Sequence, residues 1–175
     1  MRQRLAQAQL ALVLLTRVPC GSLRGPVPTL ASAAWAFPLA GFLVGLIAAG
    51  VMGAALALGL SPPVAAGLGL GAQVMATGAL HEDGLADVAD GFGGGRDVAA
   101  KLEIMRDSRL GTYGALALVV SFASKLAALA ALPDGMVVQS LIAAHALGRG
   151  ALPWIAISLP YARKDGLAAN AGRPD

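Results

Sequence analysis

The sequence contains a run of 56 residues, from 25 to 80, with no Asp, Glu, Lys, Arg or His. A membrane-spanning helix needs roughly 20 mainly apolar residues to cross about 30 Å of hydrocarbon, so this run is long enough for two spans. Only 13% of the 175 residues are charged and the mean hydropathy is +0.69, whereas soluble domains carry about 25% charged residues. These features exclude a disordered chain and predict an integral membrane protein.

Turn-forming residues divide the apolar parts of the chain into separate helices. Ser61-Pro62-Pro63 interrupts the charge-free run, and Pro133-Asp134-Gly135 separates two later apolar segments. The expected spans are residues 31–60, 64–80, 111–132 and 136–159. A first helix over residues 3–16 is expected to lie at the membrane interface or to insert partway. Because many glycines and alanines favour close helix packing, we predict an all-α, polytopic integral membrane helix bundle, organised as one domain over residues 1–175.

The basic residues fall on one side of this expected topology. The N-terminal arginines, the bases of residues 96–109 and the Arg163-Lys164 pair share that side, while the two short turns contain no Lys or Arg. By the positive-inside rule this side is cytoplasmic. We therefore expect the segment that begins after residue 80 to face the cytoplasm.

The acidic residues are concentrated in that segment. Residues 81–109 hold seven of the ten acids and four bases, although the whole chain has a net charge of +3 and a pI of about 9.5. Nucleic-acid binding requires a contiguous basic face, so no nucleic-acid partner is expected. The chemistry of the protein is expected in this acidic helical loop.

Three carboxylates of the acidic segment share one expected helix face. Asp83, Asp87 and Asp90 are spaced i, i+4 and i+7, which places them within a narrow arc. Like charges so arranged repel one another, and a bound divalent cation removes that repulsion. Oxygen ligands without cysteine favour magnesium, manganese or calcium over zinc. A solvated acidic loop that balances nearby arginines is the alternative, but the spacing favours a metal site.

The residues around these carboxylates predict where the acidic helix packs and ends. Its opposite side carries Leu85, Val88 and Ala89, which are expected to pack on the bundle. The glycine run at residues 91–95 is expected to end the helix and form a loop that can approach a ligand closely. Asp97 is expected to be the N-cap of a second helix that runs to Asp107.

The second helix brings further charged residues to the segment. Glu103 and Asp107 are spaced i, i+4, so Asp107 is a candidate to complete a metal site. Arg106 and Arg109 are candidates to bind phosphate through their planar forks of donors. Local ion pairing, such as Glu103 with Arg106, is an equally open interpretation.

Three ionisable residues lie inside the expected spans. Lys125 is in the third span, and His145 and Arg149 are spaced i, i+4 in the last one. Ionisable groups in a bilayer are costly and usually face a cavity or a partner. An aqueous pocket that opens toward the acidic segment is the simplest arrangement that accommodates all three.

Four segments of the sequence resemble the cobalamin synthase family, the adenosylcobinamide-GDP ribazoletransferases. They are TRVP at residues 16–19, FPLAG at 37–41, HEDGLADVADGFGGG at 81–95 and IMRDSRLGTYG at 104–114. The two long segments are highly specific, and the resemblance extends through essentially the whole chain to Arg163.

The resemblance implies a reaction, a cofactor and a location. The family joins adenosylcobinamide-GDP to α-ribazole or α-ribazole 5′-phosphate, forms adenosylcobalamin or its 5′-phosphate, and releases GMP. It uses magnesium (Mg2+) and works in the prokaryotic cytoplasmic, or inner, membrane. The expected partners are therefore these two substrates and the lipid bilayer, and the formation of a homo-oligomer is left open.

The residue chemistry and the resemblance together give a set of expected site residues. Magnesium is expected on the carboxylates of Glu82, Asp83, Asp87 and Asp90. Catalysis is expected from Asp90 and from Asp107, the latter as a base or an additional ligand. The expected substrate-binding residues are Arg17, His81, Arg106, Ser108, Arg109 and Arg149.

The resemblance also bears on length. Members of this family are longer than this chain and have further hydrophobic segments after the position where it stops. Residues 165–175 show no spanning pattern. The chain is therefore expected to be truncated at its C-terminus relative to the family.

Two other functions are weighed against this one. Residues 87–91 match the start of the aspartate pattern of CDP-alcohol phosphotransferases, which make phospholipids. However, Gly94-Gly95 stands where that family has an Ala-Arg pair, and Glu103 stands where it has an Asp. A divalent-cation transporter is the other alternative, but it would place carboxylates within the spans, and the expected spans contain none.

Overall fold

The structure, a computed structural model, describes residues 2–23, 25–133, 135–163, 166, 169 and 171–172. Within these ranges every regular element is a helix and there is no strand. The expected all-α class is confirmed.

The N-terminal part contains, in order, α1 (Arg2–Leu15), α2 (Leu30–Ala33), the 3-10 helix η1 (Ala34–Ala36) and α3 (Phe37–Ala57). The Thr29 hydroxyl accepts a hydrogen bond from the Ser32 backbone N–H at 3.2 Å, which caps α2 as a threonine at this position usually does. The Trp35 indole N–H donates to the Gln7 side chain at 2.9 Å. This bond ties α1 to the start of the long apolar helix.

A sharp bend follows the second apolar helix, where the sequence predicts one span over residues 64–80. The structure has α4 (Pro62–Thr77) and then α5 (Leu80–Gly94), and their axes differ by 91°. Gly78 and Ala79 between them both have left-handed backbones, with φ of 64° and 61°. A left-handed residue ends a helix, and the second one turns the chain into a new direction.

Three further helices follow in the described part of the chain: α6 (Val98–Ile104), α7 (Thr112–Ala130) and α8 (Val137–Ser158). The predicted N-cap is confirmed, because the Asp97 carboxylate accepts a hydrogen bond from the Ala100 backbone N–H at 2.9 Å. The helix that it caps ends at Ile104, three residues earlier than expected, and a turn occupies the remaining residues.

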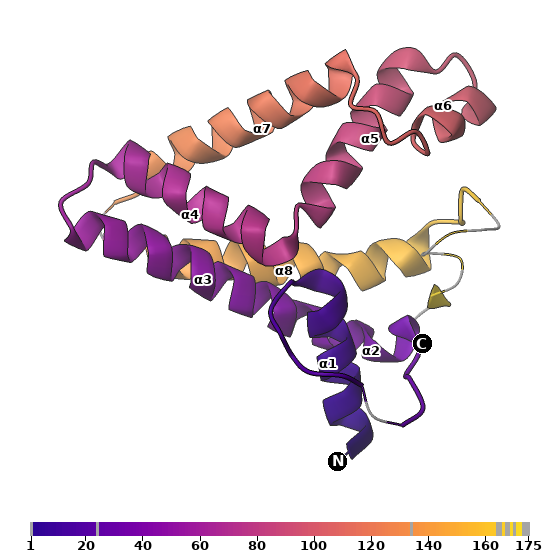
Figure 1. The fold of residues 1–175 in the computed structure, drawn as a ribbon, viewed down its shortest axis with the longest axis horizontal. Coiled ribbons are helices and arrows are strands. Elements are labelled where there is room, and N and C mark those ends of the chain that lie inside the picture. The colour runs from indigo at the N-terminus through magenta and orange to yellow at the C-terminus, as the bar shows by residue number, and fades with distance from the viewer. Residues whose placement is uncertain are drawn as a thin grey trace.

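The helices form an open, angular arrangement. Figure 1 shows α8 lying along α3 and α4 packed on α3, while α7 starts beside α5 and then runs beside α4. Helix α6 packs mainly on α5, at the end of the molecule that is far from α3. Since α4 and α5 diverge at the bend, the first turn of α5 faces α7 on one side and α8 on the other.

Small residues allow the main helix pair to approach closely, as the sequence predicts. A Cβ atom on Gly45 would lie 2.7 Å from the Leu141 carbonyl oxygen of α8, and one on Gly41 would overlap the His145 carbonyl. The pair Gly41 and Gly45 is a small-xxx-small spacing, which lets membrane helices gain backbone contact. Substitution of either glycine would force α3 and α8 apart.

The core consists of small side chains, and large apolar side chains face outward. The best-buried cluster comprises Ala48, Ala49, Met52, Ala55, Ala65, Ala66 and Leu141. Large apolar residues such as Phe42, Val119, Leu147 and Trp154 are exposed on the surface of the helices. An apolar exterior around a tightly packed interior is the pattern expected of helices in lipid.

Three helical segments are long and apolar enough to cross a membrane: Leu30–Ala57, Thr112–Ala130 and Val137–Ser158. They match the expected spans at residues 31–60, 111–132 and 136–159. Helix α4 qualifies only together with α5, as a broken span or a re-entrant loop, so the described residues provide three spans or up to four. The protein is a membrane protein by this measure.

The glycine run after the acidic helix behaves differently from its prediction. Helix α5 continues through Gly94, and the expected loop at residues 91–95 is reduced to Gly95. The glycines serve packing: a Cβ on Gly91 would lie 2.7 Å from the Met105 side chain, and one on Gly93 would overlap the Tyr113 ring. They let α6 and the start of α7 contact the α5 backbone.

The packed side of α5 also differs from its prediction. Leu85 and Val88 are exposed, whereas Ala86 is buried and its carbonyl oxygen would lie 3.0 Å from a Cβ on Gly114 of α7. The side of α5 that faces α7 therefore contains Ala86 and, one turn later, Asp90. The reason is that α7 contacts this helix through glycine, so a small side chain rather than a large one fits between them.

Candidate functional site

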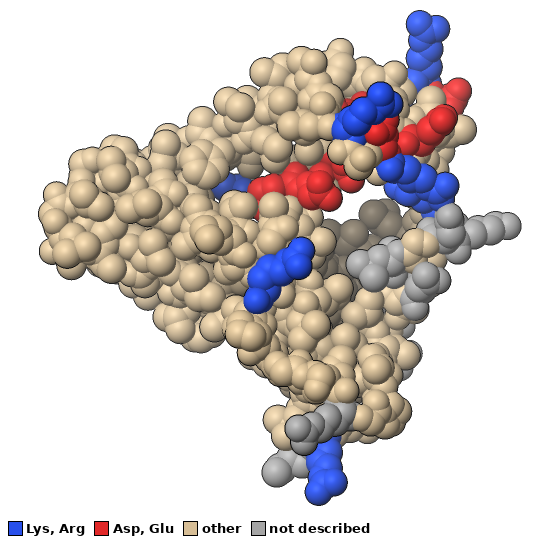
Figure 2. Space-filling view, in the orientation of Figure 1, with Lys and Arg blue, Asp and Glu red and all other residues tan. Residues whose placement is uncertain are grey.

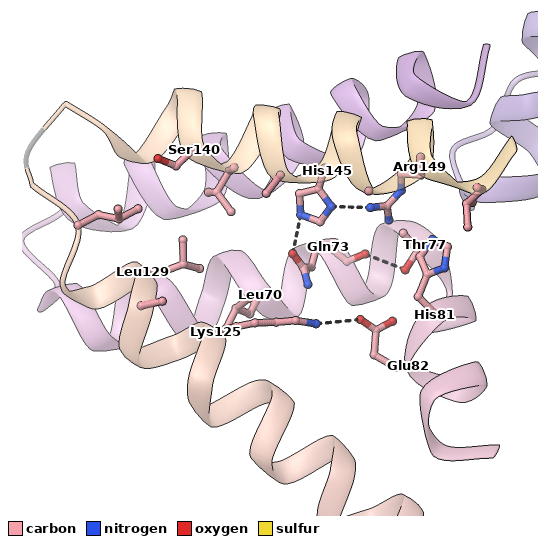
Figure 3. A pocket seen from close by; sticks show the side chains of 16 residues that line it. Leu70, Gln73, Thr77, His81, Glu82, Lys125, Leu129, Ser140, His145 and Arg149 are labelled. Atoms are coloured by element: carbon pink, nitrogen blue, oxygen red, sulfur yellow. Dashed lines mark hydrogen bonds and ion pairs between the residues drawn. The ribbon is translucent and has the colours of Figure 1, made fainter. Parts of the chain in front are cut away.

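A cavity of about 520 Å³ lies between α4, α5, α7 and α8 (Figure 3), and we call it the inner cavity. Most of its wall is apolar and comes from five leucines: Leu70, Leu129, Leu132, Leu141 and Leu152. Eight polar or charged side chains also line it: Gln73, Thr77, His81, Glu82, Lys125, Ser140, His145 and Arg149. The predicted pocket around the ionisable residues of the spans is confirmed.

One row of hydrogen bonds crosses the inner cavity. Arg149 Nη1 lies 2.7 Å from His145 Nδ1, and His145 Nε2 lies 2.7 Å from Gln73 Oε1. Because a guanidinium only donates hydrogen bonds, His145 Nδ1 must accept and the proton of this imidazole must be on Nε2, facing the Gln73 carbonyl. The row therefore fixes a neutral tautomer of His145.

Among the described residues, three buried polar atoms at the inner cavity find no hydrogen-bond partner: His81 Nε2, Glu82 Oε2 and Arg149 Nε. Arg149 is only 7% exposed. The other oxygen of Glu82 lies 4.0 Å from Lys125 Nζ, at the limit of an ion pair, and Figure 3 shows these two side chains pointing toward one another. Buried polar atoms are usually satisfied, so three unpaired ones at a single cavity indicate a place for a polar ligand.

A second, more open cavity of about 460 Å³ lies where α5, α6 and α7 meet, and we call it the outer cavity. Its lining includes Asp90, Asp107 and Arg109. The two residues expected to act in catalysis are thus brought together at this place, with one of the expected phosphate-binding arginines.

Asp90 holds the N-terminus of α7. Its two carboxylate oxygens accept hydrogen bonds from the backbone N–H groups of Gly111 and Gly114, each at 2.8 Å. A Cβ on either glycine would overlap this carboxylate. The close approach explains why glycines stand at both positions, and a negative charge at a helix N-terminus is also favoured by the helix dipole. Both oxygens of this expected metal ligand are engaged by protein.

Asp107 and Arg109 are paired with one another. The Arg109 Nε–H donates to both Asp107 oxygens, at 3.0 and 2.9 Å, and the Arg109 backbone N–H donates to one of them at 3.1 Å. These hydrogen bonds from a cation hold the pKa of the Asp107 carboxyl below its usual value. The Arg109 side chain remains 87% exposed, so a solvated phosphate can reach it.

The remaining predicted residues are spread along the surface. Asp83 is exposed and Asp87 partly so, and the charges of Asp83, Asp90 and Arg163 all act on the Asp87 carboxylate. Figure 2 shows the acidic side chains gathered along the α5 and α6 part of the molecule, next to an opening. Ser108 and Arg106 are exposed in the turn that follows α6.

Arg17 lies at the bend and lines neither cavity. Its backbone N–H donates to the Ala76 carbonyl at 2.6 Å, and its side chain occupies the space where a Cβ on Gly78 would be. The structure therefore places this expected phosphate-binding residue against the turn between α4 and α5. It does not bring it to the other predicted residues.

The four expected metal ligands separate into three surroundings. Glu82 lines the inner cavity, Asp90 contacts α7, and Asp83 and Asp87 lie on α5 between the two cavities. Across the described part of the chain, no three His, Cys, Asp or Glu side chains come close enough to hold a metal ion together.

Two lining residues were not predicted from the sequence. Gln73 and Thr77 are neutral, and the prediction considered ionisable residues only. Gln73 is nevertheless the only Asn or Gln in the 56-residue charge-free run, and an amide within a span usually bonds to another helix. That signal would have found it. Thr77 bonds to carbonyls of its own helix and offers no comparable signal.

Comparison with known proteins adds independent findings. The protein-family model described as "Cobalamin-5-phosphate synthase" matches residues 7–173. Three curated relatives, each named "Adenosylcobinamide-GDP ribazoletransferase", come from Bradyrhizobium diazoefficiens, Mesorhizobium japonicum and Sinorhizobium medicae. They are 48%, 51% and 51% identical over 175, 172 and 163 residues, which cover 99%, 98% and 90% of this chain.

These alignments cover 67%, 66% and 62% of the relatives, so the chain spans about two thirds of their length. No solved structure is similar enough to this chain to count as a match.

Proposed function

The chain belongs to the cobalamin-5-phosphate synthase family, and from that premise we propose that it is an adenosylcobinamide-GDP ribazoletransferase. The observation that supports this activity, in addition to the family, is that α5 contributes residues to both cavities. This one helix contributes Glu82 to a mainly apolar cavity and Asp90 to an exposed, charged one, with two carboxylates between them. An apolar acceptor and a phosphate-bearing donor need two such surroundings side by side.

The proposed reaction transfers the cobinamide-phosphate group to ribazole. A ribose hydroxyl oxygen of α-ribazole, or of its 5′-phosphate, forms a bond to the phosphorus that carries the cobinamide. The bond from that phosphorus to the bridging oxygen of GMP breaks, and GMP leaves with the electron pair. The hydroxyl proton passes to a carboxylate or to solvent. Reactions of this kind depend mainly on positioning and on charge neutralisation.

We propose magnesium as the cofactor from the chemistry of the available donors. Magnesium commonly binds one or two carboxylates and completes its shell with water and substrate phosphates. Asp83 and Asp87 fit that role, because no backbone amide of the described residues engages them as two amides engage Asp90. The ion would supply positive charge beside the pyrophosphate. Glu82 is better suited to the inner cavity, where its unpaired oxygen lies.

The outer cavity is suited to the phosphates. Arg109 is exposed, and its guanidinium donates hydrogen bonds to the Asp107 carboxylate. A phosphate offers the same bidentate acceptor geometry. When Arg109 turns to a phosphate, Asp107 loses the hydrogen bonds that lower its pKa and becomes a stronger base. Asp107 is therefore the residue that we propose to accept a proton, and Ser108 and Arg106 are proposed to contact substrate at the same surface. Arg17 lies at the bend between α4 and α5 and has no place in this proposed phosphate site.

The location follows the charge pattern. The Lys and Arg residues lie on the same side of the spans as α5 and α6. The positive-inside rule assigns that side to the cytoplasm. We propose that the protein lies in the prokaryotic cytoplasmic membrane with both cavities accessible from that side.

Membranes that contain this chain test the function directly. Given adenosylcobinamide-GDP, α-ribazole and magnesium, they are expected to release GMP, and membranes without the chain provide the control. If the membranes release no GMP but release CMP from a CDP-alcohol, the assignment is wrong and the phospholipid alternative is correct.

A further inference from the structure

The inner cavity combines an apolar wall with one polar end. The wall is formed by leucines of α4, α7, α8 and the turn after α7. The polar end contains Glu82, His81 and Arg149, each with one buried atom unpaired among the described residues. A ligand that satisfies them must have an apolar body and a small group that both donates and accepts hydrogen bonds. Its donor would meet the Glu82 carboxylate, and its acceptor would meet the Arg149 Nε–H.

The volume of the cavity distinguishes between the parts of the two substrates. A cavity of about 520 Å³ is within the range of roughly 300–1,000 Å³ that holds a drug-sized molecule. A corrin ring with its side chains is too large for a cavity of this volume. Guanine has polar groups around its whole edge, which a wall of leucines would leave unpaired. A ribazole has an apolar bicyclic base and a ribose with hydroxyl groups.

We propose that the inner cavity is the binding site for the ribazole acceptor, with its base against the leucines and its ribose hydroxyls at Glu82, His81 and Arg149. This inference rests on the proposed function, since that function supplies the ligand. The row from Gln73 through His145 to Arg149 holds the guanidinium in place, and His145 is a positioning residue within it.

The position of the cavity on α5 agrees with this assignment. Glu82 precedes Asp83 in the chain and lies five residues before Asp87, which at about 1.5 Å per residue is roughly 8 Å along the helix. An acceptor whose hydroxyls contact Glu82 therefore presents them toward the carboxylates that we propose to hold magnesium. The acceptor reaches the phosphates from the inner cavity, and the donor reaches them from the outer one.

Gly148 provides a test that adds a side chain to the cavity and removes no interaction. It lines the cavity, it has a helical backbone in α8, and a Cβ on it would meet no atom within 4 Å. Gly148→Leu is thus expected to fold and to fill space that the ribazole base would occupy. Gly50→Leu is the matched control, because Gly50 is an exposed helical glycine of α3 that also has open space around its Cβ position.

Equilibrium dialysis with radiolabelled α-ribazole, on protein purified in detergent, measures binding without turnover. Gly148→Leu is expected to weaken binding of α-ribazole and of its 5′-phosphate at least tenfold, while Gly50→Leu binds both as the wild type does. Equal binding by the two variants would overturn the inference. Wild-type protein that binds α-ribazole here but releases no GMP would contradict the proposed function and leave the binding site standing.

Kinetics of Glu82→Gln provide a second, independent measurement. Loss of one charged hydrogen bond is expected to raise the KM for α-ribazole about tenfold, with the KM for adenosylcobinamide-GDP unchanged. The magnesium concentration that gives half the maximal rate is also expected to stay the same. A shift in the magnesium requirement with no change in the KM for α-ribazole would instead make Glu82 a metal ligand and overturn its role here.

Discussion

The inner and outer cavities differ in how their charged side chains are neutralised. In the inner cavity Arg149 is buried and bonded to a neutral histidine, so part of its donor capacity remains unused. In the outer cavity Arg109 is exposed and paired with the partly exposed carboxylate of Asp107. An unpaired charge in a low-dielectric region is costly, whereas an exposed pair can exchange partners at little cost. The inner cavity thus holds a buried cation with an unused donor, whereas the outer cavity holds an exposed ion pair whose partners can separate.

Helix α5 is shared by the two cavities, and the largest effect is expected on the part that connects them. Asp87→Asn removes a carboxylate charge that we propose to act beside the pyrophosphate, and it is expected to lower the rate of GMP release by about 10²-fold or more. Glu103→Gln, an isosteric change on exposed α6, serves as the control with unchanged rate. Normal GMP release by Asp87→Asn membranes containing equal amounts of protein would refute the role of Asp87.

The inner cavity depends on the contact between α3 and α8, which a large side chain would break. Gly45→Leu is expected to destabilise the protein by about 1–3 kcal/mol, because the added atoms overlap the α8 backbone. The thermal unfolding temperature in detergent measures this effect. Gly50→Leu has no such overlap and is expected to unfold near the wild-type temperature. If Gly45→Leu and Gly50→Leu unfold at the same temperature, the close approach of α3 and α8 does not stabilise the inner cavity.

The outer cavity depends on Asp90, and its removal is expected to cost less. Asp90→Ala leaves the backbone N–H groups of Gly111 and Gly114 without their acceptor, which corresponds to about 0.5–2 kcal/mol for the loss of a helix cap. Unfolding temperature again provides the measurement. Asp97→Ala removes a cap from the short, exposed α6 and is expected to have a smaller effect. A larger effect at Asp97 would show that α6, not α7, determines stability in this region.

The smallest effect on stability, but a specific one on titration, is expected at the exposed pair. Asp107 has a pKa below its ordinary value near 3.8, since Arg109 bonds to it. A carboxyl whose pKa is lowered by folding stabilises the protein above its unfolded pKa, and that contribution is lost as the pH falls through the folded pKa. Arg109→Gln is expected to raise the pKa of Asp107 toward 3.8, as measured by carboxyl carbon NMR. An unchanged pKa would mean that Arg109 does not control this carboxyl.

Much of the fold follows from patterns that are local in the sequence. Three spans match their helices because length and hydropathy determine them, and the Asp97 cap depends only on its own neighbours. The inner cavity was predictable because Lys125, His145 and Arg149 have no favourable place within lipid other than a cavity. In each case the physical cause lies in one segment or in the membrane itself.

The features that were missed depend on contacts between segments. The bend at residues 78–79 requires an alanine in a left-handed conformation, which no local preference indicates. The capping role of Asp90 depends on two glycines more than twenty residues later. Gly91 and Gly93 are typical of a loop in isolation, and their helical conformation follows only from the side chains that pack on them.

The bend has a mechanical consequence for the reacting groups. The direction of α5 is fixed at its start by the left-handed residues Gly78 and Ala79. Towards its end it is held by the hydrogen bonds that Asp90 accepts from the Gly111 and Gly114 backbone N–H groups. Asp90 lies eleven residues beyond Ala79, a lever arm of about 16 Å. A 10° change in the bend would move Asp90 by about 3 Å, which is more than its hydrogen bonds can stretch. The backbone torsions of Gly78 and Ala79 therefore set the distance between the inner and outer cavities, as long as the hydrogen bonds of Asp90 hold the far end of α5.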